Sequence, residues 1–113
     1  MLDLWETIRH NVYVRVIGLK PLREFWISHN DAETPLRLWY KTAENATWSN
    51  LRDVRRTYPQ ADGVKTQGGE ILTVFNIGGN KYRLVVRIRY DYELINVRSV
   101  LTHAEYDEGN WKE

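Results

Sequence analysis

The stretch from Asn76 to Tyr90, NIGGNKYRLVVRIRY, decides the fold, because a glycine turn leads directly into an alternating strand. Side chains of a β-strand point alternately to its two faces. One face carries apolar and aromatic side chains: Tyr82, Leu84, Val86, Ile88 and Tyr90. The other carries cations, with Val85 among them: Lys81, Arg83, Arg87 and Arg89. We therefore predict a strand over residues 81–90 with one face toward a core and the other open to solvent.

The cationic face indicates a polyanionic ligand. Side chains on one face of a strand are roughly 6.5–7 Å apart, a spacing close to the phosphate repeat of an extended single strand of nucleic acid. No acidic residue occurs within residues 71–90. The same cations also fit a plain solvated face, or a sheet edge protected against aggregation.

Length and composition narrow the class of protein. The chain has 113 residues, which suits one domain, and a net charge of +1, so its positive charge is local rather than general. It has no cysteine, which excludes disulfides, thiol catalysis and cysteine-ligated zinc. No apolar run approaches the ~18–20 residues of a membrane span, and the first residues lack a signal-peptide pattern. We expect a cytoplasmic protein that does not associate with membranes.

Periodicity, turn residues and caps predict the remaining elements. They are a strand over 11–17, a helix from Lys20, a second helix over 32–46, a short third helix capped by Asn50, a loop over 59–70, strands over 71–76 and 95–101, and a short helix or turn over 102–107. Helices followed by strands favour an α+β fold, with a small antiparallel sheet and the N-terminal helices packed on one face. We expect the first strand to join that sheet.

Residues directly after the last predicted strand can carry chemistry. His103 has the side chain whose pKa lies nearest neutrality, and Tyr106 can exchange a proton when cations lower its pKa. If the last strand pairs with the cationic strand, both lie near Arg83 or Arg87. A base, an arginine and an acid so arranged fit RNA cleavage by the ribose 2′-hydroxyl, with no metal required and none indicated by ligand spacing. A helix cap followed by a surface histidine fits the same pattern.

Two segments together, VFNIGGNKYRLV over residues 74–85 and THAEYD over residues 102–107, resemble the HigB family of bacterial type II toxins. Segments at residues 20–26, 48–54 and 58–62 resemble that family as well. The resemblance implies a toxin domain over residues 12–111 within a single domain of residues 1–113, with residues 1–11 as an extension.

The resemblance implies a RelE-like fold and an mRNA endonuclease that acts on messages held in the ribosome, with no cofactor or metal. It also implies a helix-turn-helix antitoxin of the HigA type. By the same resemblance the catalytic residues are Arg83, Tyr106 and His103, and Lys81 contacts phosphate. From the cationic face we add Arg87 and Arg89, together with Asn80, as RNA-binding residues. Two alternatives remain at this point: a non-catalytic RelE-like module that binds RNA or the antitoxin, and an inactive toxin homologue.

Overall fold

The computed structural model describes residues 15–113. In chain order the elements are β1 (Arg15–Ile17), α2 (Lys20–Ser28), η1 (Asn30–Ala32), α3 (Glu33–Glu44), α4 (Leu51–Thr57), β2 (Asp62–Lys65), β3 (Ile71–Ile77), β4 (Tyr82–Arg89), η2 (Tyr90–Tyr92), β5 (Leu94–Thr102), α5 (His103–Glu108) and η3 (Asn110–Lys112), where η marks a 3-10 helix. The predicted extension over residues 1–11 and the predicted strand residues 11–14 lie outside the described part.

The strands form one five-stranded sheet in the order β1-β5-β4-β3-β2, which confirms the α+β prediction and the place of the first strand. Neighbouring strands are antiparallel, except that β1 runs parallel to β5. The antiparallel expectation was therefore wrong for β1. Helices α2, α3 and α4 lie between β1 and the rest of the sheet in the chain, and such a long connection permits a parallel neighbour.

The predicted loop over residues 59–70 was wrong in part, because it contains β2. This strand pairs with β3 as a hairpin, and its connection is closed by hydrogen bonds between Thr66 and Glu70: the Thr66 N–H donates to the Glu70 carbonyl at 2.8 Å. Strand β2 forms the edge of the sheet, and most of its residues are exposed. Exposed edge strands contain few apolar residues in an alternating pattern. Because residues 62–65 are mostly polar, their sequence was interpreted as a loop.

Helices α2, α3 and α4 begin where the sequence signals predict. Pro21 lies in the first turn of α2, where its missing N–H costs no hydrogen bond. The Asn50 side chain caps α4 by accepting a hydrogen bond from the Asp53 N–H at 2.9 Å. Local chemistry therefore sets where these helices begin.

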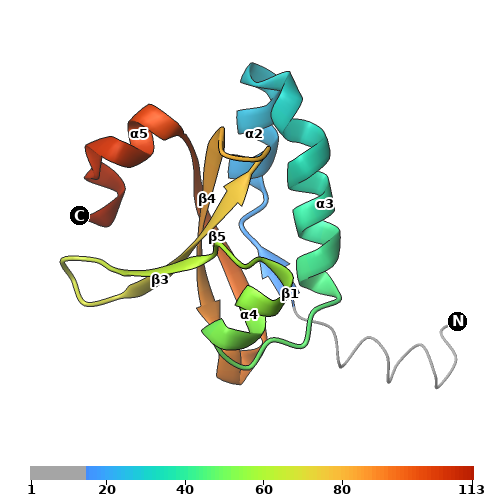
Figure 1. Cartoon of the computed structure of the whole chain (residues 1–113), viewed down its shortest axis with the longest axis vertical. Coiled ribbons are helices and arrows are strands. Elements are labelled where there is room, and N and C mark those ends of the chain that lie inside the picture. The colour runs from blue at the N-terminus through green and yellow to red at the C-terminus, as the bar shows by residue number, and fades with distance from the viewer. Residues whose placement is uncertain (1–14) are drawn as a thin grey trace, which may run out of the picture.

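The main core lies between the sheet and helices α2 and α3, which cover one side of it (Figure 1). Its largest fully buried side chains come from α3, β3, β4 and β5, and include Leu36, Trp39, Phe75, Leu84 and Ile95. The rings of Trp39 and Phe75 meet edge to face with their centres 5.5 Å apart. The apolar face of the alternating strand is thus the core face, as predicted.

The opposite face of the sheet is only partly open to solvent, which corrects the prediction. Leu72, Val74 and Val85 are buried there as a second, smaller cluster. Tyr106 of α5 and Trp111 of η3 pack against this cluster, so the C-terminal segment covers part of the face (Figure 1). Val85, the one apolar residue among the predicted cations, is the centre of that contact.

Candidate active site

Pairing of β4 with β5 brings the predicted site residues to one corner of the sheet. Arg83, near the start of β4, lies opposite Leu101, near the end of β5. Helix α5 begins directly afterwards, at His103, because Thr102 and Glu105 form a capping box. In it the Thr102 hydroxyl accepts from the Glu105 N–H at 3.2 Å, and the Glu105 carboxylate accepts from the Thr102 N–H at 2.9 Å. The cap therefore starts α5 next to Arg83.

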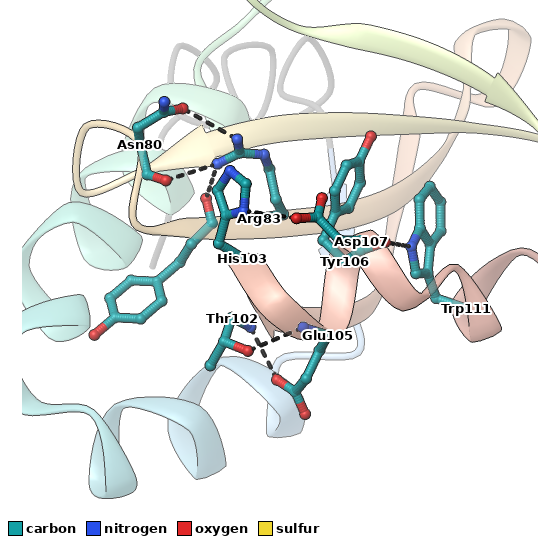
Figure 2. Close-up of polar contacts among 9 residues, drawn as sticks. Asn80, Arg83, Thr102, His103, Glu105, Tyr106, Asp107 and Trp111 are labelled. Atoms are coloured by element: carbon teal, nitrogen blue, oxygen red, sulfur yellow. Dashed lines mark hydrogen bonds and ion pairs between the residues drawn. The ribbon is translucent and has the colours of Figure 1, made fainter.

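Tyr106 and His103 face the arginine. They are three residues apart on α5, so they share one face of the helix, and that face is turned toward β4 (Figure 2). The Arg83 guanidinium carbon lies 5.5 Å from the centre of the Tyr106 ring, a cation–π distance. Tyr106 also stacks on Trp111, with ring centres 4.9 Å apart. The aromatic pair thus forms one wall beside the guanidinium.

The Arg83 side chain is held by the turn that precedes β4. One terminal nitrogen, Nη1, donates to the carbonyl oxygens of Asn80 at 3.1 Å and Tyr82 at 3.2 Å. The other, Nη2, donates to the Asn80 side-chain oxygen at 3.0 Å. Gly78 and Gly79 have φ values of 63° and 69°, a conformation that glycine adopts without strain, and they turn the chain so that Asn80 reaches back. Three of the five guanidinium N–H groups are used among residues 15–113, which leaves two for a ligand.

Burial of Arg83 differs from the prediction. Its relative exposure is only 9%, whereas an open cationic face was expected. Asn80, Tyr82 and Tyr106 surround the guanidinium, so its charge is only partly screened by water. A fixed and poorly hydrated guanidinium stabilises a nearby anion more strongly than a mobile surface arginine does.

His103 is paired with a carboxylate that the sequence analysis did not single out. Its Nδ1 lies 3.1 Å from Asp107 Oδ2 across one turn of α5. An ionised carboxylate only accepts hydrogen bonds, so Nδ1 carries the proton, and Nε2 of the neutral ring has a free lone pair. The histidine side chain is about half exposed, at 51%. Spacing of four residues on a helix was the signal that could have revealed Asp107.

Tyr106 does not have the lowered pKa that a neighbouring cation was expected to produce. Burial raises the pKa of the Tyr106 hydroxyl, the negative charge of Asp62 raises it further, and Arg83 lowers it by less than these together. The hydroxyl therefore stays protonated at neutral pH. In this state it can donate a hydrogen bond or a proton, and it is a poor base.

A family comparison matches residues 32–109 of this chain, a segment that contains Arg83, His103 and Tyr106. The matching family is HigB_toxin, described as the RelE-like toxic component of a toxin-antitoxin system. The chain belongs to the HigB toxin family. The RelE-like fold and the family resemblance found in the sequence are thereby confirmed, and a toxin of such a system has an antitoxin partner.

Individual HigB proteins align with most of the chain. The mRNA interferase toxin HigB of Escherichia coli strain K12 is 26% identical over 94 residues, which cover 83% of this chain and 88% of that protein. An mRNA interferase HigB of Shigella flexneri aligns with the same identity and coverage. Another from Escherichia coli O6:H1 is 23% identical over 95 residues, covering 84% of this chain and 90% of that protein.

The remaining cations of this HigB-family chain do not form the continuous row that was predicted. Lys81 precedes β4 and forms an ion pair with Asp31 of η1, which also accepts from the Tyr82 hydroxyl at 2.6 Å. The hydrogen bond from Lys81 holds the pKa of the Asp31 carboxyl below its ordinary value, and the bond from Tyr82 adds to this effect. Lys81 is thereby turned toward the helix layer.

Arg87 and Arg89 are also engaged elsewhere. Arg87 donates to Glu70 at 2.8 Å, and Arg98 donates to the same carboxylate oxygen at 2.6 Å. Arg89 lies over the Tyr92 ring at 4.8 Å, beyond Arg87 along β4 and away from Arg83. Of the four predicted cations, Arg83 is the one that the structure brings against Tyr106.

Among residues 15–113, no three histidine, cysteine or carboxylate side chains cluster in a way that could hold a metal ion. No helix within the same residues is long and apolar enough to cross a membrane.

Proposed function

We propose that this HigB-family toxin is an endoribonuclease that cleaves mRNA through attack of a ribose 2′-hydroxyl on the adjacent phosphate. The observation that carries the proposal is the guanidinium of Arg83, held by Asn80 and placed against Tyr106 on the helix face shared with His103. Family membership supports a toxin, and the names of the similar HigB proteins, mRNA interferases, support RNA as the substrate.

Each of the three side chains has a separate role in the reaction. Nε2 of His103 takes the proton of the 2′-hydroxyl, and the 2′-oxygen forms a bond to phosphorus. Arg83 donates hydrogen bonds to the phosphoryl oxygens as negative charge develops there. The bond from phosphorus to the 5′-oxygen breaks, and Tyr106 gives that oxygen its proton. The products are a 2′,3′-cyclic phosphate and a 5′-hydroxyl, so atoms and charges balance without a co-reactant.

Asp107 supports this division of roles. By accepting the hydrogen bond from Nδ1 of His103, it orients the ring and stabilises the imidazolium that forms when Nε2 takes a proton. The raised pKa of Tyr106 favours the role of proton donor over that of base. The sequence left the two proton transfers unassigned, and these contacts are the reason for the present assignment.

Substitution of Arg83 tests the proposal in cells that lack the antitoxin. We expect Arg83→Ala to lower mRNA cleavage by about 10²–10³-fold, the usual cost of removing one donor to a developing oxyanion. Arg56→Ala on α4 is the control, because Arg56 is an exposed arginine far along the chain from the site. Growth arrest and message decay in wild type and the control, with neither in Arg83→Ala, support the proposal. Intact messages in the wild type would overturn it.

The same proposal includes where the enzyme acts and which molecules it binds. We place the enzyme in the cytoplasm, acting on messages held in the ribosome, with a HigA-type helix-turn-helix antitoxin as its inhibitor. The RNA backbone would meet Asn80 first, beside Arg83, and then Lys81, Arg87 and Arg89 after exchange of their present contacts. Copurification of the tagged inactive variant with ribosomes, with and without the antitoxin, tests this arrangement.

One observation favours a second function, that of a non-catalytic module which binds RNA or the antitoxin. Arg83 is largely covered, and the charge of Arg87 is offset by Glu70, so these two arginines offer little freely exposed charge on this face of the sheet. This alternative predicts RNA binding that weakens with salt and yields no cleavage products, even with ribosomes present.

A further inference from the structure

A cavity of about 290 Å³ lies beside the turn that holds Arg83, and the cleavage chemistry proposed above uses none of its lining residues. It is bordered by the segment that follows α4 and by the β3–β4 turn. Its walls are formed by Tyr58, Pro59, Gln60, Ala61, Asn76 and Gly79. The volume is just under the ~300–1,000 Å³ of pockets that enclose drug-sized ligands, so it suits a ligand of one or two rings.

The cavity is next to the candidate active site. Asn76 lies directly opposite Arg83 in the pairing of β3 with β4, so the two side chains share one face of the sheet. Neighbouring strands are about 4.8 Å apart. A ligand in the cavity would therefore lie within one nucleotide of an anion bound at Arg83.

A chain of hydrogen bonds links the cavity to the arginine and fixes the orientation of three amides. Arg83 can only donate, so Asn80 must present its oxygen to it. That oxygen also accepts from Asn76 Nδ2 at 3.3 Å, so the amide nitrogen of Asn76 points toward Asn80. The same nitrogen donates to Gln60 Oε1 at 2.6 Å. Both N–H groups of Asn76 are thereby used.

This orientation determines what the cavity presents to a ligand. Gln60 has used its oxygen, so its two Nε2 donors remain, and Asn76 keeps its Oδ1 acceptor. The free donor group and the free acceptor group therefore belong to two amides that are in direct contact. Each nucleobase has an edge with an adjacent donor and acceptor, and asparagine and glutamine are common readers of such edges.

The other walls suit a flat, uncharged ring. Tyr58 is anchored by an edge-to-face contact with Phe75, with ring centres 5.2 Å apart, and Pro59 follows it directly. Aromatic and proline surfaces support bases by stacking. Among residues 15–113, no charged side chain lines the cavity, so neither a phosphate nor a metal ion finds a charged partner there.

We propose that this cavity binds one unpaired nucleobase of the RNA, the base next to the phosphate held at Arg83, and that Gln60 and Asn76 read its edge. The inference rests on the proposed endoribonuclease function for its biological meaning. Base binding itself needs no cleavage, so it can be tested even if the chain proves inactive.

The first test is binding of the four nucleosides, followed by NMR through the side-chain amide signals of Gln60 and Asn76. Gln60→Glu keeps an oxygen for the Asn76 contact and replaces only the outward donors by an acceptor. Gln67→Glu, on the exposed connection between β2 and β3, is the matched control for the added charge. We expect wild type and the control to bind at least one nucleoside, and Gln60→Glu to bind it about tenfold more weakly, the effect of roughly one hydrogen bond.

The second test is the base preference of cleavage. We expect wild type and Gln67→Glu to share a preference at one position beside the cut, and Gln60→Glu to change that preference while still cutting RNA. Amide signals unmoved by all four nucleosides, or Gln60→Glu and Gln67→Glu with equal binding and preference, would overturn the base site. If nucleosides bind as expected but no variant cuts RNA, the endoribonuclease proposal fails and the base site stands.

Discussion

The two faces of the sheet differ in what they bury. The face under α2 and α3 is mainly apolar, with Phe75 and Leu84 at 0% exposure and Thr73 as its buried polar residue on β3. The face under α5 has only a small apolar cluster, and beside it lies the buried charge of Arg83. Neighbouring residues of β3 illustrate the contrast, since Val74 packs on the α5 side and Phe75 on the other. One face therefore stabilises the fold, and the other supports the site.

The first prediction compares how much each face of the sheet contributes to the stability of the fold. Phe75→Ala should lower the free energy of unfolding by about 3–5 kcal/mol, because it leaves a cavity in the main core. Val74→Ala should cost about 2 kcal/mol, since it removes fewer carbons from the smaller cluster. Chemical denaturation of both variants provides the measurement. A greater loss for Val74→Ala would mean that the α5 face is the principal core.

The second prediction separates two arginines on the α5 face. Arg83→Lys should lower RNA cleavage by about 100-fold, because a lysine cannot replace the three directed bonds of the guanidinium. Arg87→Lys should change it by about threefold or less, since a lysine can still pair with Glu70. Cleavage of a defined message by the purified variants decides between them. Equal losses would show that the whole strand acts as one cationic surface.

Much of the sheet face that packs against α2 and α3 could be predicted from the sequence. The covering of the opposite face by α5 could not. Helical spacing, Pro21 and the Asn50 cap were enough for α2, α3 and α4, and alternation was enough for the apolar side of β4. The missed signal for a second covered face was the almost continuous apolar run over residues 71–75 of β3, in which Thr73 is the one polar residue. A strand that is buried on both faces has a continuous run of apolar residues rather than an alternating pattern. Val85 stands among the cations of β4 because it too is buried on the α5 face.

The sequence was a better guide to which residues form the candidate site than to the contacts that these residues make. The sequence indicated Arg83, His103 and Tyr106, and the structure places Arg83 against Tyr106; their catalytic roles stay predictions. The burial of Arg83 depends on the Asn80 turn, three residues earlier in the chain, and on α5, whose contact with Arg83 is tertiary and is encoded by no local pattern. Lys81 was assigned to the wrong face, because its partner Asp31 lies fifty residues earlier in the chain.

A third and smaller effect concerns α5 itself. Asp107→Asn should lower cleavage about tenfold, because a neutral amide stabilises the protonated His103 ring less well. Glu108→Gln is the matched control, as it removes a neighbouring carboxylate that has no ion-pair partner among residues 15–113. Single-turnover rates at saturating RNA supply the comparison. Identical rates for the two variants would remove Asp107 from the mechanism.

The smallest effect tests the placement of Lys81 on the helix side. The pKa of Asp31 is lowered in the folded chain, so its stabilising contribution is present above the unfolded pKa and is lost as pH falls through the folded value. Wild type should therefore be more stable than Asp31→Asn at neutral pH, and the difference should shrink below about pH 4. Asp91→Asn, which removes another surface carboxylate, should show no such convergence. Thermal unfolding across pH follows both, and a constant difference would contradict the ion pair.

The central claim is that Arg83, Tyr106 and His103 act together to cleave RNA by 2′-hydroxyl attack. Its most direct test is the chemistry of the RNA ends left after the wild-type chain is expressed without its antitoxin. We expect fragments that end in 2′,3′-cyclic phosphates and begin with 5′-hydroxyls, and that are lost in Arg83→Lys. Fragments with 3′-hydroxyls and 5′-phosphates, or the same fragments from Arg83→Lys, would contradict it.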